Sequence, residues 1–353
     1  MSIFTKKIKT MKKILVTGGL GYIGSHTIIF LLEKGYIPVV IDNLSNSHIE
    51  IKDNIEKISN KQLSFYNVDL LETNSCINLL KNEGEFVGAI HFAALKSVSE
   101  SFEKPDEYYR NNVQGVESLL KIMQELKIKN LIFSSSCAVY GNVSQFPVNE
   151  KSLSIEPLTP YGVTKKRGEE LILNYSKIHD LSSIALRYFN PIGAHESGMI
   201  GEYPIGKPHN LMPFITQTAI GDRECLEVFG DNYDTKDGSC VRDYIHVTDL
   251  AEIHILALEY IISNPISYNN FFNVGTGKGV STFELIETFE KINKVKIPKK
   301  ISSKRKGDIP MVYADATKAM DFFKWKPKKT VEDAVKSAWK WEQFKKFNMQ
   351  IDN

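Results

Sequence analysis

Tyr161 and Lys165 stand four residues apart in the string Y-G-V-T-K, directly after Pro160. Proline is favoured where a helix begins, so we expect a helix here, and a spacing of four places both side chains on one face. An ammonium beside a phenol favours the phenolate, which can take the proton of an alcohol while hydride leaves the same carbon. Ser136, at a predicted strand end, could hold the alcohol oxygen. Taken alone, such a spacing could also be an accident of a helix face.

The string K-I-L-V-T-G-G-L-G-Y-I-G near the N-terminus predicts the corner of a fold that binds a dinucleotide. It joins a short apolar run, typical of a buried parallel strand, to a helical pattern that starts at Tyr22 and Ile23. Gly18 allows a tight turn, Gly21 lets a pyrophosphate approach the backbone, and Gly24 lets helix and strand pack closely. The free N–H groups of the helix would face the anion. An ordinary tight turn remains the alternative for this motif by itself.

A second predicted strand, residues 37–41, ends in Asp42. A dinucleotide fold is expected to carry an acid about 20 residues after its glycines, where the carboxylate accepts the adenosine ribose hydroxyls. A carboxylate there would repel a 2′-phosphate, so NAD is favoured over NADP. The alternative interpretation of Asp42 is a residue that caps a turn.

Further strands are predicted at residues 64–68, 87–92 and 131–133, and a long helix at residues 105–127. Strands that alternate with helices predict an α/β fold with a doubly wound parallel sheet, which binds ligands at the carboxyl ends of its strands. Asp69 could there reach the adenine amino group or merely cap a turn. The residues at these ends or near the start of the long helix include Asn43, Asn46, Asp69, Leu70, Phe92, Ala93, Lys96, Asn111 and Ser134.

The composition is that of a globular protein, with 353 residues of which 42% are hydrophobic and 24% charged. A net charge of +2 gives no indication of a nucleic acid or a membrane surface as partner. The four cysteines show no C-x-x-C pairing and the histidines no ligand spacing, so we expect reduced thiols, a cytoplasmic location and no metal. Residues 1–10 form a basic tail without the apolar core of a signal peptide, and no run is long enough to span a bilayer.

Several longer strings carry a resemblance to a known family. With the glycine motif and the Tyr161–Lys165 pair, they make the chain resemble the extended short-chain dehydrogenase/reductase superfamily and, within it, UDP-glucose 4-epimerase (UDP-galactose 4-epimerase). The resemblance runs from about residue 14 to about residue 341. The strings are D-N-L-S-N-S at 42–47, E-Y-Y-R-N-N-V at 107–113, S-S-S-C-A-V-Y-G at 134–141, R-Y-F-N-P-I-G-A-H at 187–195, N-L-M-P at 210–213, V-R-D-Y-I-H-V-T-D-L at 241–250 and R-K-G-D at 305–308.

The resemblance implies a Rossmann-type NAD-binding domain over residues 11–189 and a smaller α/β domain that binds the UDP-sugar over residues 190–353. Residues 241–262 would pack back on the first domain. The cofactor would be tightly bound NAD. The family also implies a homodimer, for which the segments at 105–127 and 161–178 are candidate contact faces.

The resemblance also assigns roles to single residues. Tyr161, Lys165 and Ser136 would be catalytic. The residues expected to contact NAD are Gly18, Gly21, Tyr22, Ile23, Gly24, Asp42, Asn43, Asn46, Asp69, Leu70, Phe92, Ala93, Lys96, Asn111, Ser134, Tyr161, Lys165 and Tyr188. The residues expected to contact the UDP-sugar are Lys96, Ser136, Tyr161, Asn190, Asn210, Leu211, Glu227, Phe229, Arg242, Arg305, Asp308 and Val312.

Two positions depart from the family pattern. Ala138 stands where many relatives have a hydroxyl residue, so any hydrogen bond from that hydroxyl to the sugar is lost. Val312 stands where a tyrosine would exclude an N-acetyl group from the sugar pocket. A small residue there implies an additional activity on UDP-N-acetylhexosamines, unless Val312 merely fills core space.

The implied activity is inversion at carbon 4 of the sugar. Tyr161 takes the proton of the 4-hydroxyl while C4 gives hydride to NAD, and the 4-keto sugar turns before the hydride returns to its other face. Three alternatives remain. A 4,6-dehydratase needs an acid pair where Cys137 and Ala138 stand, a net dehydrogenase must exchange its cofactor, and an NAD-binding sensor would be expected to lack Tyr161 or Lys165.

Overall fold

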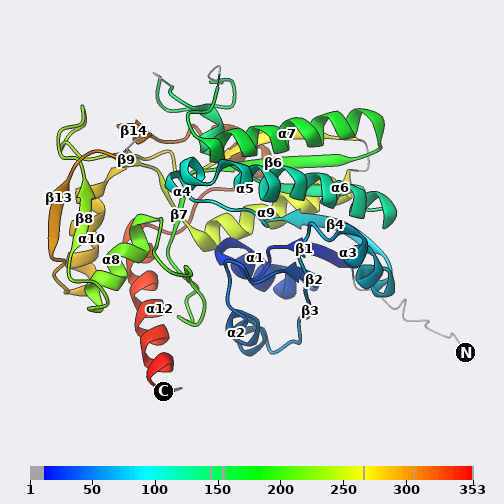
Figure 1. Cartoon of the computed structure of the whole chain (residues 1–353), viewed down its shortest axis with the longest axis horizontal. Coiled ribbons are helices and arrows are strands. Elements are labelled where there is room, and N and C mark those ends of the chain that lie inside the picture. The colour runs from blue at the N-terminus through cyan, green and yellow to red at the C-terminus, as the bar shows by residue number, and fades with distance from the viewer. Residues whose placement is uncertain (1–11, 144, 153–155, 265–266, 306, 352–353) are drawn as a thin grey trace, which may run out of the picture.

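A parallel sheet of seven strands forms the centre of the molecule (Figure 1). The computed structural model describes residues 12–143, 145–152, 156–264, 267–305 and 307–351, and the predicted tail at residues 1–10 lies outside them. The strand order is β11-β6-β5-β4-β1-β2-β3, and each neighbouring pair is parallel. The strands are β1 (Lys13–Thr17), β2 (Ile37–Asp42), β3 (Ser64–Asn67), β4 (Phe86–His91), β5 (Asn130–Ser136), β6 (Ser182–Tyr188) and β11 (Asn269–Val274).

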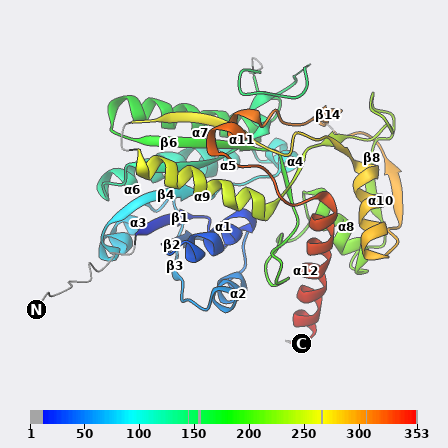
Figure 2. The same cartoon turned by 180° about the vertical axis from the view of Figure 1, so that it is seen from behind.

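Helices cover both faces of this sheet, and Figure 2 shows α9 beside α1 on one of them. That face carries α1 (Tyr22–Glu33), α2 (Glu50–Ser59) and α9 (Val247–Ser263), and the other carries α3 (Thr73–Leu80), α6 (Gly115–Glu125) and α7 (Pro160–Ile178). In β1, Ile14 and Val16 pack in the apolar core on the side of α1 and α9, and Leu15 packs in the core on the side of α3, α6 and α7. All three residues are fully buried. Burial on both faces explains the continuous apolar run. The predicted doubly wound sheet is confirmed.

The smaller part of the molecule lies beside the carboxyl ends of these strands, at the end of the molecule that holds α8, α10 and α12 in Figure 1. Its three helices share an apolar core. Its elements are β7 (Asn190–Ile192), α8 (Leu211–Ala219), β8 (Leu226–Phe229), β9 (Val241–Arg242), β10 (Tyr244–His246), β12 (Val280–Ser281), α10 (Thr282–Asn293), β13 (Lys299–Ser302), β14 (Met311–Val312) and α12 (Val331–Ile351).

The short strands of this part pair as β8 with β13, β7 with β10, and β12-β9-β14 in one small sheet. Two later elements, α9 and β11, nevertheless pack on or join the large sheet. The chain therefore crosses more than once between the two parts. A domain boundary between residues 189 and 190 stays a prediction.

The predicted helix at 105–127 is interrupted by one turn of π-helix. α5 (Pro105–Tyr109) leads into the π-helical segment η2 (Arg110–Gln114), which leads into α6. The wider turn carries Asn112, whose side chain exchanges hydrogen bonds with the backbone of Leu95 at 2.8 and 2.9 Å and donates to Thr164 at 3.0 Å. π-helical turns often occur at functional sites, and this one fixes the loop after β4 to α7.

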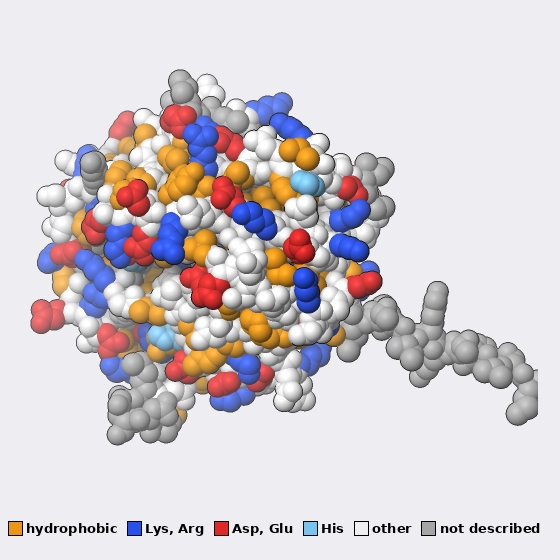
Figure 3. All heavy atoms as spheres, turned by 45° about the vertical axis from the view of Figure 1, so that its right-hand side comes forward, with side chains coloured by type: hydrophobic (Ala, Val, Ile, Leu, Met, Phe, Trp, Pro, Cys, Tyr) orange, Lys and Arg blue, Asp and Glu red, His pale blue; other side chains and the backbone are white. Residues whose placement is uncertain are grey.

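The remaining short elements are η1 (Lys81–Glu83), α4 (Val98–Glu103), η3 (Cys137–Tyr140) and α11 (Thr317–Phe323). In the part of the chain that the structure describes, no helix is both long and apolar enough to cross a membrane. On the face drawn in Figure 3, acidic and basic side chains are interspersed, with apolar atoms between them.

Candidate active site

A cavity of about 820 Å³ lies between the carboxyl ends of the parallel strands and the smaller part. Most of the predicted site residues line it: Gly18, Gly21, Tyr22, Ile23, Gly24, Asn43, Asn46, Asp69, Phe92, Lys96, Asn111, Ser134, Ser136, Tyr161, Lys165, Tyr188, Asn190, Asn210, Leu211, Glu227, Phe229, Arg242, Arg305, Asp308 and Val312. Residues that were predicted to contact two different ligands thus share one space.

Three predicted residues do not line the cavity themselves. The carboxylate of Asp42 is 8% exposed and accepts hydrogen bonds from the backbone of Leu20 and Leu44, both at 3.0 Å, and from the hydroxyl of Ser47 at 2.8 Å. A carboxylate has about four acceptor positions, so one remains for a ligand. Ala93 donates its N–H to the carbonyl of Thr17, beside the glycine turn.

Leu70 is the third. Its side chain is 7% exposed and packs into the apolar core beneath α3 and α6. The side chain therefore faces away from the cavity, and a ligand could reach this residue only through its backbone. The predicted contact between Leu70 and NAD is therefore limited to the backbone atoms of this residue, because the side chain is part of the apolar core.

The glycine turn forms a cradle that side chains would fill. Gly18 has a φ of +68°, and a Cβ there would lie 2.5 Å from the backbone nitrogen of Ala93. A Cβ on Gly24 would lie 2.6 Å from the carbonyl oxygen of Gly18, and one on Gly21 would lie 3.2 Å from it. No side chain caps the start of α1. Its first N–H groups are therefore available to an anion in the cavity.

The start of α7 brings the predicted catalytic residues against the end of β5. Thr159 caps the helix by accepting a hydrogen bond from the backbone of Gly162 at 3.0 Å. The Nζ of Lys165 donates to the carbonyl oxygen of Ser134 at 2.7 Å and lies 6.0 Å from the ring centroid of Tyr161. Ser136 is the last residue of β5. The three residues that were predicted to be catalytic, Ser136, Tyr161 and Lys165, all line the cavity.

Burial dominates the electrostatics of this pair. It raises the pKa of Tyr161 to about 12, although a hydrogen bond with Ser136 works in the opposite direction. Burial likewise lowers the pKa of Lys165 to about 7, opposed by the negative charge of Glu169. In the chain alone, burial therefore favours the protonated phenol of Tyr161. A cation in the cavity, such as the expected nicotinamide, would lower the pKa of Tyr161 and favour the phenolate.

The opposite wall of the cavity is basic. Arg305 donates through Nε to Asp308 at 3.0 Å, and its guanidinium lies 4.6 Å from the ring centroid of Phe229. Arg242 places its Nη2 atom 3.8 Å from the same carboxylate of Asp308. Two guanidinium groups thus share one acid, and phosphate oxygens could occupy the donor positions that remain. Glu227 forms an exposed ion pair with Lys300 at 2.8 Å.

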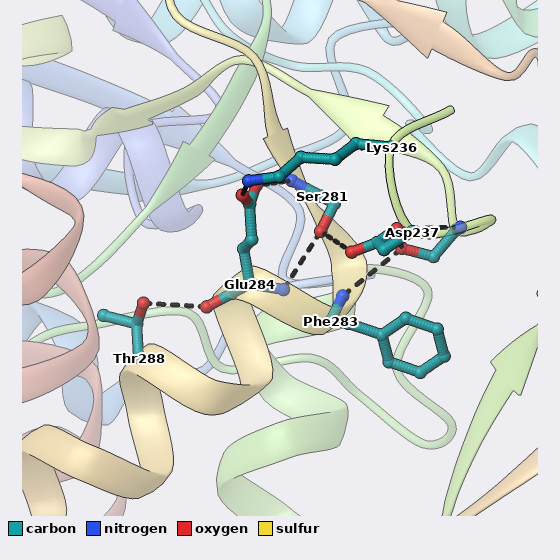
Figure 4. A network of polar contacts seen from close by, with 7 residues as sticks. Lys236, Asp237, Ser281, Phe283, Glu284 and Thr288 are labelled. Carbon is teal, nitrogen blue, oxygen red and sulfur yellow. Dashed lines mark hydrogen bonds and ion pairs between the residues drawn. The ribbon is translucent and has the colours of Figure 1, made fainter.

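A polar network fixes the loop that leads to Arg242 (Figure 4). Asp237 accepts hydrogen bonds from the backbone and hydroxyl of Ser239, at 2.9 and 2.8 Å, and from the hydroxyl of Ser281. Ser281 in turn forms a capping box with Glu284 at the start of α10. The loop, β12 and α10 therefore hold β9 in place from one side, and Arg242 lies at the end of that strand.

The other predicted residues occupy distinct places around the cavity. Asn43 donates to Asp69 at 3.0 Å, which joins the ends of β2 and β3. Val312 is 5% exposed, pairs with Arg242 between β14 and β9, and packs in a small apolar cluster that includes Phe189. Among the described residues, no group of three or more His, Cys, Asp or Glu side chains is arranged to hold a metal ion.

Sequence reasoning missed Glu202. Its Oε1 atom accepts from the Nζ of Lys96 at 2.8 Å and from the Nδ2 of Asn210 at 2.5 Å, so it joins the loop after β4 to the start of α8. Glu202 lies in a loop without periodic pattern, and no spacing relates it to Lys96, which is 106 positions away. Only the folded structure shows that Glu202 contacts Lys96 and Asn210.

Comparisons with known proteins agree with this geometry. The family described as GDP-mannose 4,6 dehydratase matches residues 15–338. A UDP-glucose 4-epimerase of Yersinia enterocolitica is 48% identical over 94% of this chain and 97% of its own, and one of Bacillus subtilis is 44% identical over 93% and 96%.

Two solved structures give the same result. The UDP-glucose 4-epimerase of Stenotrophomonas maltophila, with bound NAD and formylated UDP-arabinopyranose, has a TM-score of 0.91 and 40% identity, covering 96% of this chain and 99% of that one. The enzyme of Bifidobacterium longum, in complex with NAD⁺ and UDP, has a TM-score of 0.91 and 40% identity, covering 94% and 98%. With this agreement over nearly the whole chain, in sequence and in structure, the protein belongs to the UDP-glucose 4-epimerase family of the extended short-chain dehydrogenases/reductases.

Proposed function

We propose that this protein is an NAD-dependent epimerase that interconverts UDP-galactose and UDP-glucose by inversion at carbon 4 of the sugar. The observation that carries the proposal is the convergence of three features on one cavity: the glycine cradle, the Tyr161–Lys165 pair and the two arginines Arg242 and Arg305. Curated relatives that match over nearly their full length carry this activity in their names.

The residues present fit NAD. The cradle at Gly18 and Gly24 has no room for a Cβ, and the uncapped start of α1 offers N–H groups to a pyrophosphate. Asp42 keeps one acceptor position for the adenosine ribose. Neighbouring epimerase structures contain bound NAD. When bound, NAD would accept a hydride from C4, return it to the other face, and add the positive charge that Tyr161 needs for ionisation.

The protein's own residues supply the proton chemistry and the anchoring. Tyr161 would take the proton of the 4-hydroxyl and later return it, with the hydroxyl of Ser136 holding the same oxygen. Lys165 would keep a positive charge near the phenol. Arg242 and Arg305 would hold the diphosphate, so the sugar can turn while the nucleotide stays fixed.

Two competing activities are less well supported. A 4,6-dehydratase would need an acid pair next to Ser136, where Cys137 and Ala138 stand in η3, although the matching family bears a dehydratase description. A sensor without catalysis would not need Tyr161 and Lys165 buried together in the cavity wall.

Incubation of the purified protein with UDP-galactose, without added NAD, tests the proposal. An epimerase with tightly bound NAD releases UDP-glucose and reaches an equilibrium between the two sugars. A stable 4-keto product would instead indicate a dehydratase, and accumulation of NADH on addition of NAD a net dehydrogenase. No conversion with NAD supplied would contradict all catalytic roles.

We further propose that the sugar pocket admits N-acetylhexosamines. Val312 lines the cavity and is branched at Cβ, so it is short and stiff. Val312→Tyr is expected to lower turnover of UDP-N-acetylglucosamine at least tenfold more than turnover of UDP-galactose, because the ring would occupy the space of the acetyl group; a factor of about ten corresponds to roughly 1.4 kcal/mol. Steady-state kinetics on both sugars measure the ratio. Val312→Ala is the control, and a ratio unchanged by the tyrosine would remove Val312 from the pocket wall.

The assembly and the location complete the proposal. A homodimer through α5, α6 and α7 is supported by the packing of these helices side by side and by exposed Tyr109 and Ile178 on α5 and α7, 48% and 80% exposed. A mass of one chain by light scattering would contradict it. All four cysteines are free thiols, the state that a reducing compartment maintains, and this supports a cytoplasmic location.

A further inference from the structure

The loop that follows β7 crosses from the large sheet to the smaller part, and we call its residues 193–205 the strap. In both Figure 1 and Figure 2 the segment between β7 and α8 runs between α1 and α12. Its last residues, 201–205, line the cavity together with Asn43, Asn46 and His48 of the loop after β2. The strap thus forms part of the cavity wall next to the loop on which an adenosine is expected.

The C-terminal helix holds the strap from behind, although α12 itself does not line the cavity. The Nε1 of Trp341 donates to the carbonyl oxygen of Glu202 at 3.1 Å, and the Nζ of Lys340 donates to that of Glu196 at 2.6 Å. The indole of Trp341 lies so close to the backbone that a Cβ on Gly201 would be 2.4 Å from it. The strap is therefore fixed on its outer side by backbone contacts.

The large sheet's side holds the strap through three polar contacts. The hydroxyl of Tyr22 donates to the carbonyl oxygen of Gly193 at 2.6 Å, and Asn54 donates to that of Met199 at 2.9 Å. The third contact is the ion pair between Lys96 and Glu202. These contacts come from α1, α2 and the loop after β4.

The fourth contact on that side is an aromatic stack. The rings of His48 and Tyr203 lie nearly parallel, with centroids 3.6 Å apart and an angle of 14° between their planes. Both residues line the cavity and both are only half-buried. His48 comes six residues after Asp42, at the end of the loop on which the adenosine ribose is expected to lie. The stack bridges the cavity rim at this point.

We propose that the strap, fastened by the stacking of Tyr203 on His48, closes the cavity over the adenosine half of NAD and slows the release of the cofactor. The inference rests on the proposed function. An epimerase uses NAD twice in each turnover without net redox change, so a cofactor that left between the two hydride transfers would leave a 4-keto sugar behind. A closed wall on the adenosine side prevents that loss without touching the reacting atoms.

The test compares NAD retention in Tyr203→Ala and His48→Ala with that in the wild type and in Tyr203→Phe, which keeps the ring. Each protein is passed through gel filtration and dialysed, its NAD content is measured after acid release, and the dissociation rate is followed by exchange with labelled NAD. Phe347→Ala, an exposed aromatic on α12, is the surface control. Because His48 and Tyr203 are only half-buried, we expect the variants to fold, and circular dichroism checks that they do.

Loss of an aromatic stack is expected to raise the NAD dissociation rate roughly two- to tenfold in both alanine variants. Both changes break the stack, but Tyr203→Ala also removes the ring contacts of Tyr203 with Trp341 and Lys345. The double variant should therefore be no faster than Tyr203→Ala alone. Tyr203→Phe and Phe347→Ala should keep the wild-type dissociation rate and the wild-type turnover with saturating NAD. If NAD dissociated from the alanine variants at the wild-type rate, the proposed role of the strap and its stack would be wrong. A wild type that holds no NAD and converts no sugar would instead contradict the proposed function itself.

Discussion

Replacing Tyr161 by phenylalanine is expected to lower kcat by about 10²- to 10⁴-fold, the usual contribution of a general base. The substitution removes one oxygen from a ring that is 9% exposed, so packing and the bound cofactor should persist. Burial raises the pKa of this phenol to about 12, so its ionisation depends on positive charge near the ring. The loss of rate should therefore be accompanied by loss of the pH dependence that ionisation of Tyr161 gives to kcat.

Single-turnover and steady-state assays with UDP-galactose measure this effect. Tyr244→Phe is a matched control, since Tyr244 also lines the cavity, is 5% exposed and has a pKa raised by burial to about 12. The control should stay within about threefold of the wild type, a difference smaller than 1 kcal/mol. Near-native kcat in Tyr161→Phe would remove this residue from the proton transfer.

A second large effect is expected behind the catalytic helix, where Glu169 lies one turn beyond Lys165. Its carboxylate accepts from Arg187 at 2.8 and 2.6 Å and from the hydroxyl of Ser135 at 2.5 Å. The side chains of Glu169 and Arg187 are each only 5% exposed. Consecutive residues of β5 thus bind α7, since the carbonyl of Ser134 holds Lys165 and the hydroxyl of Ser135 holds Glu169.

Arg187→Met is expected to lower the free energy of unfolding by about 3–5 kcal/mol, because it leaves the carboxylate of Glu169 buried without the guanidinium that balances its charge. Urea unfolding followed by circular dichroism measures the loss. The double variant Arg187→Met with Glu169→Leu removes both charges and should recover most of the stability, since a buried ion pair gains little over apolar residues of similar volume. If the single variant were as stable as the double one, the pair would not be buried as described.

The residues that carry local information could be identified without the fold. Gly18 and Gly24 predict a tight turn between a strand and a helix, because a Cβ at either position would collide with backbone atoms. The turn could be predicted because the residues that form it are close in sequence. The spacing of Tyr161 and Lys165 is a property of any helix. The alternation of buried strands with helices likewise follows from short periodic patterns, which is why the doubly wound sheet was predicted correctly.

Tertiary structure alone decided how these residues behave. The pKa of Tyr161 is raised by burial, which depends on how the folded chain encloses the ring, and the phenolate at this position stays a prediction for the protein with NAD bound. Glu202 reaches Lys96 across 106 positions, and Tyr203 stacks on His48 from a loop without any pattern. Burial, charge pairing and stacking between distant segments depend on how the whole chain packs, and no spacing in the sequence encodes them. The sequence therefore determined most of the residues that were predicted to surround the cavity and do so, whereas packing determined their partners and brought in residues such as Glu202 and Tyr203.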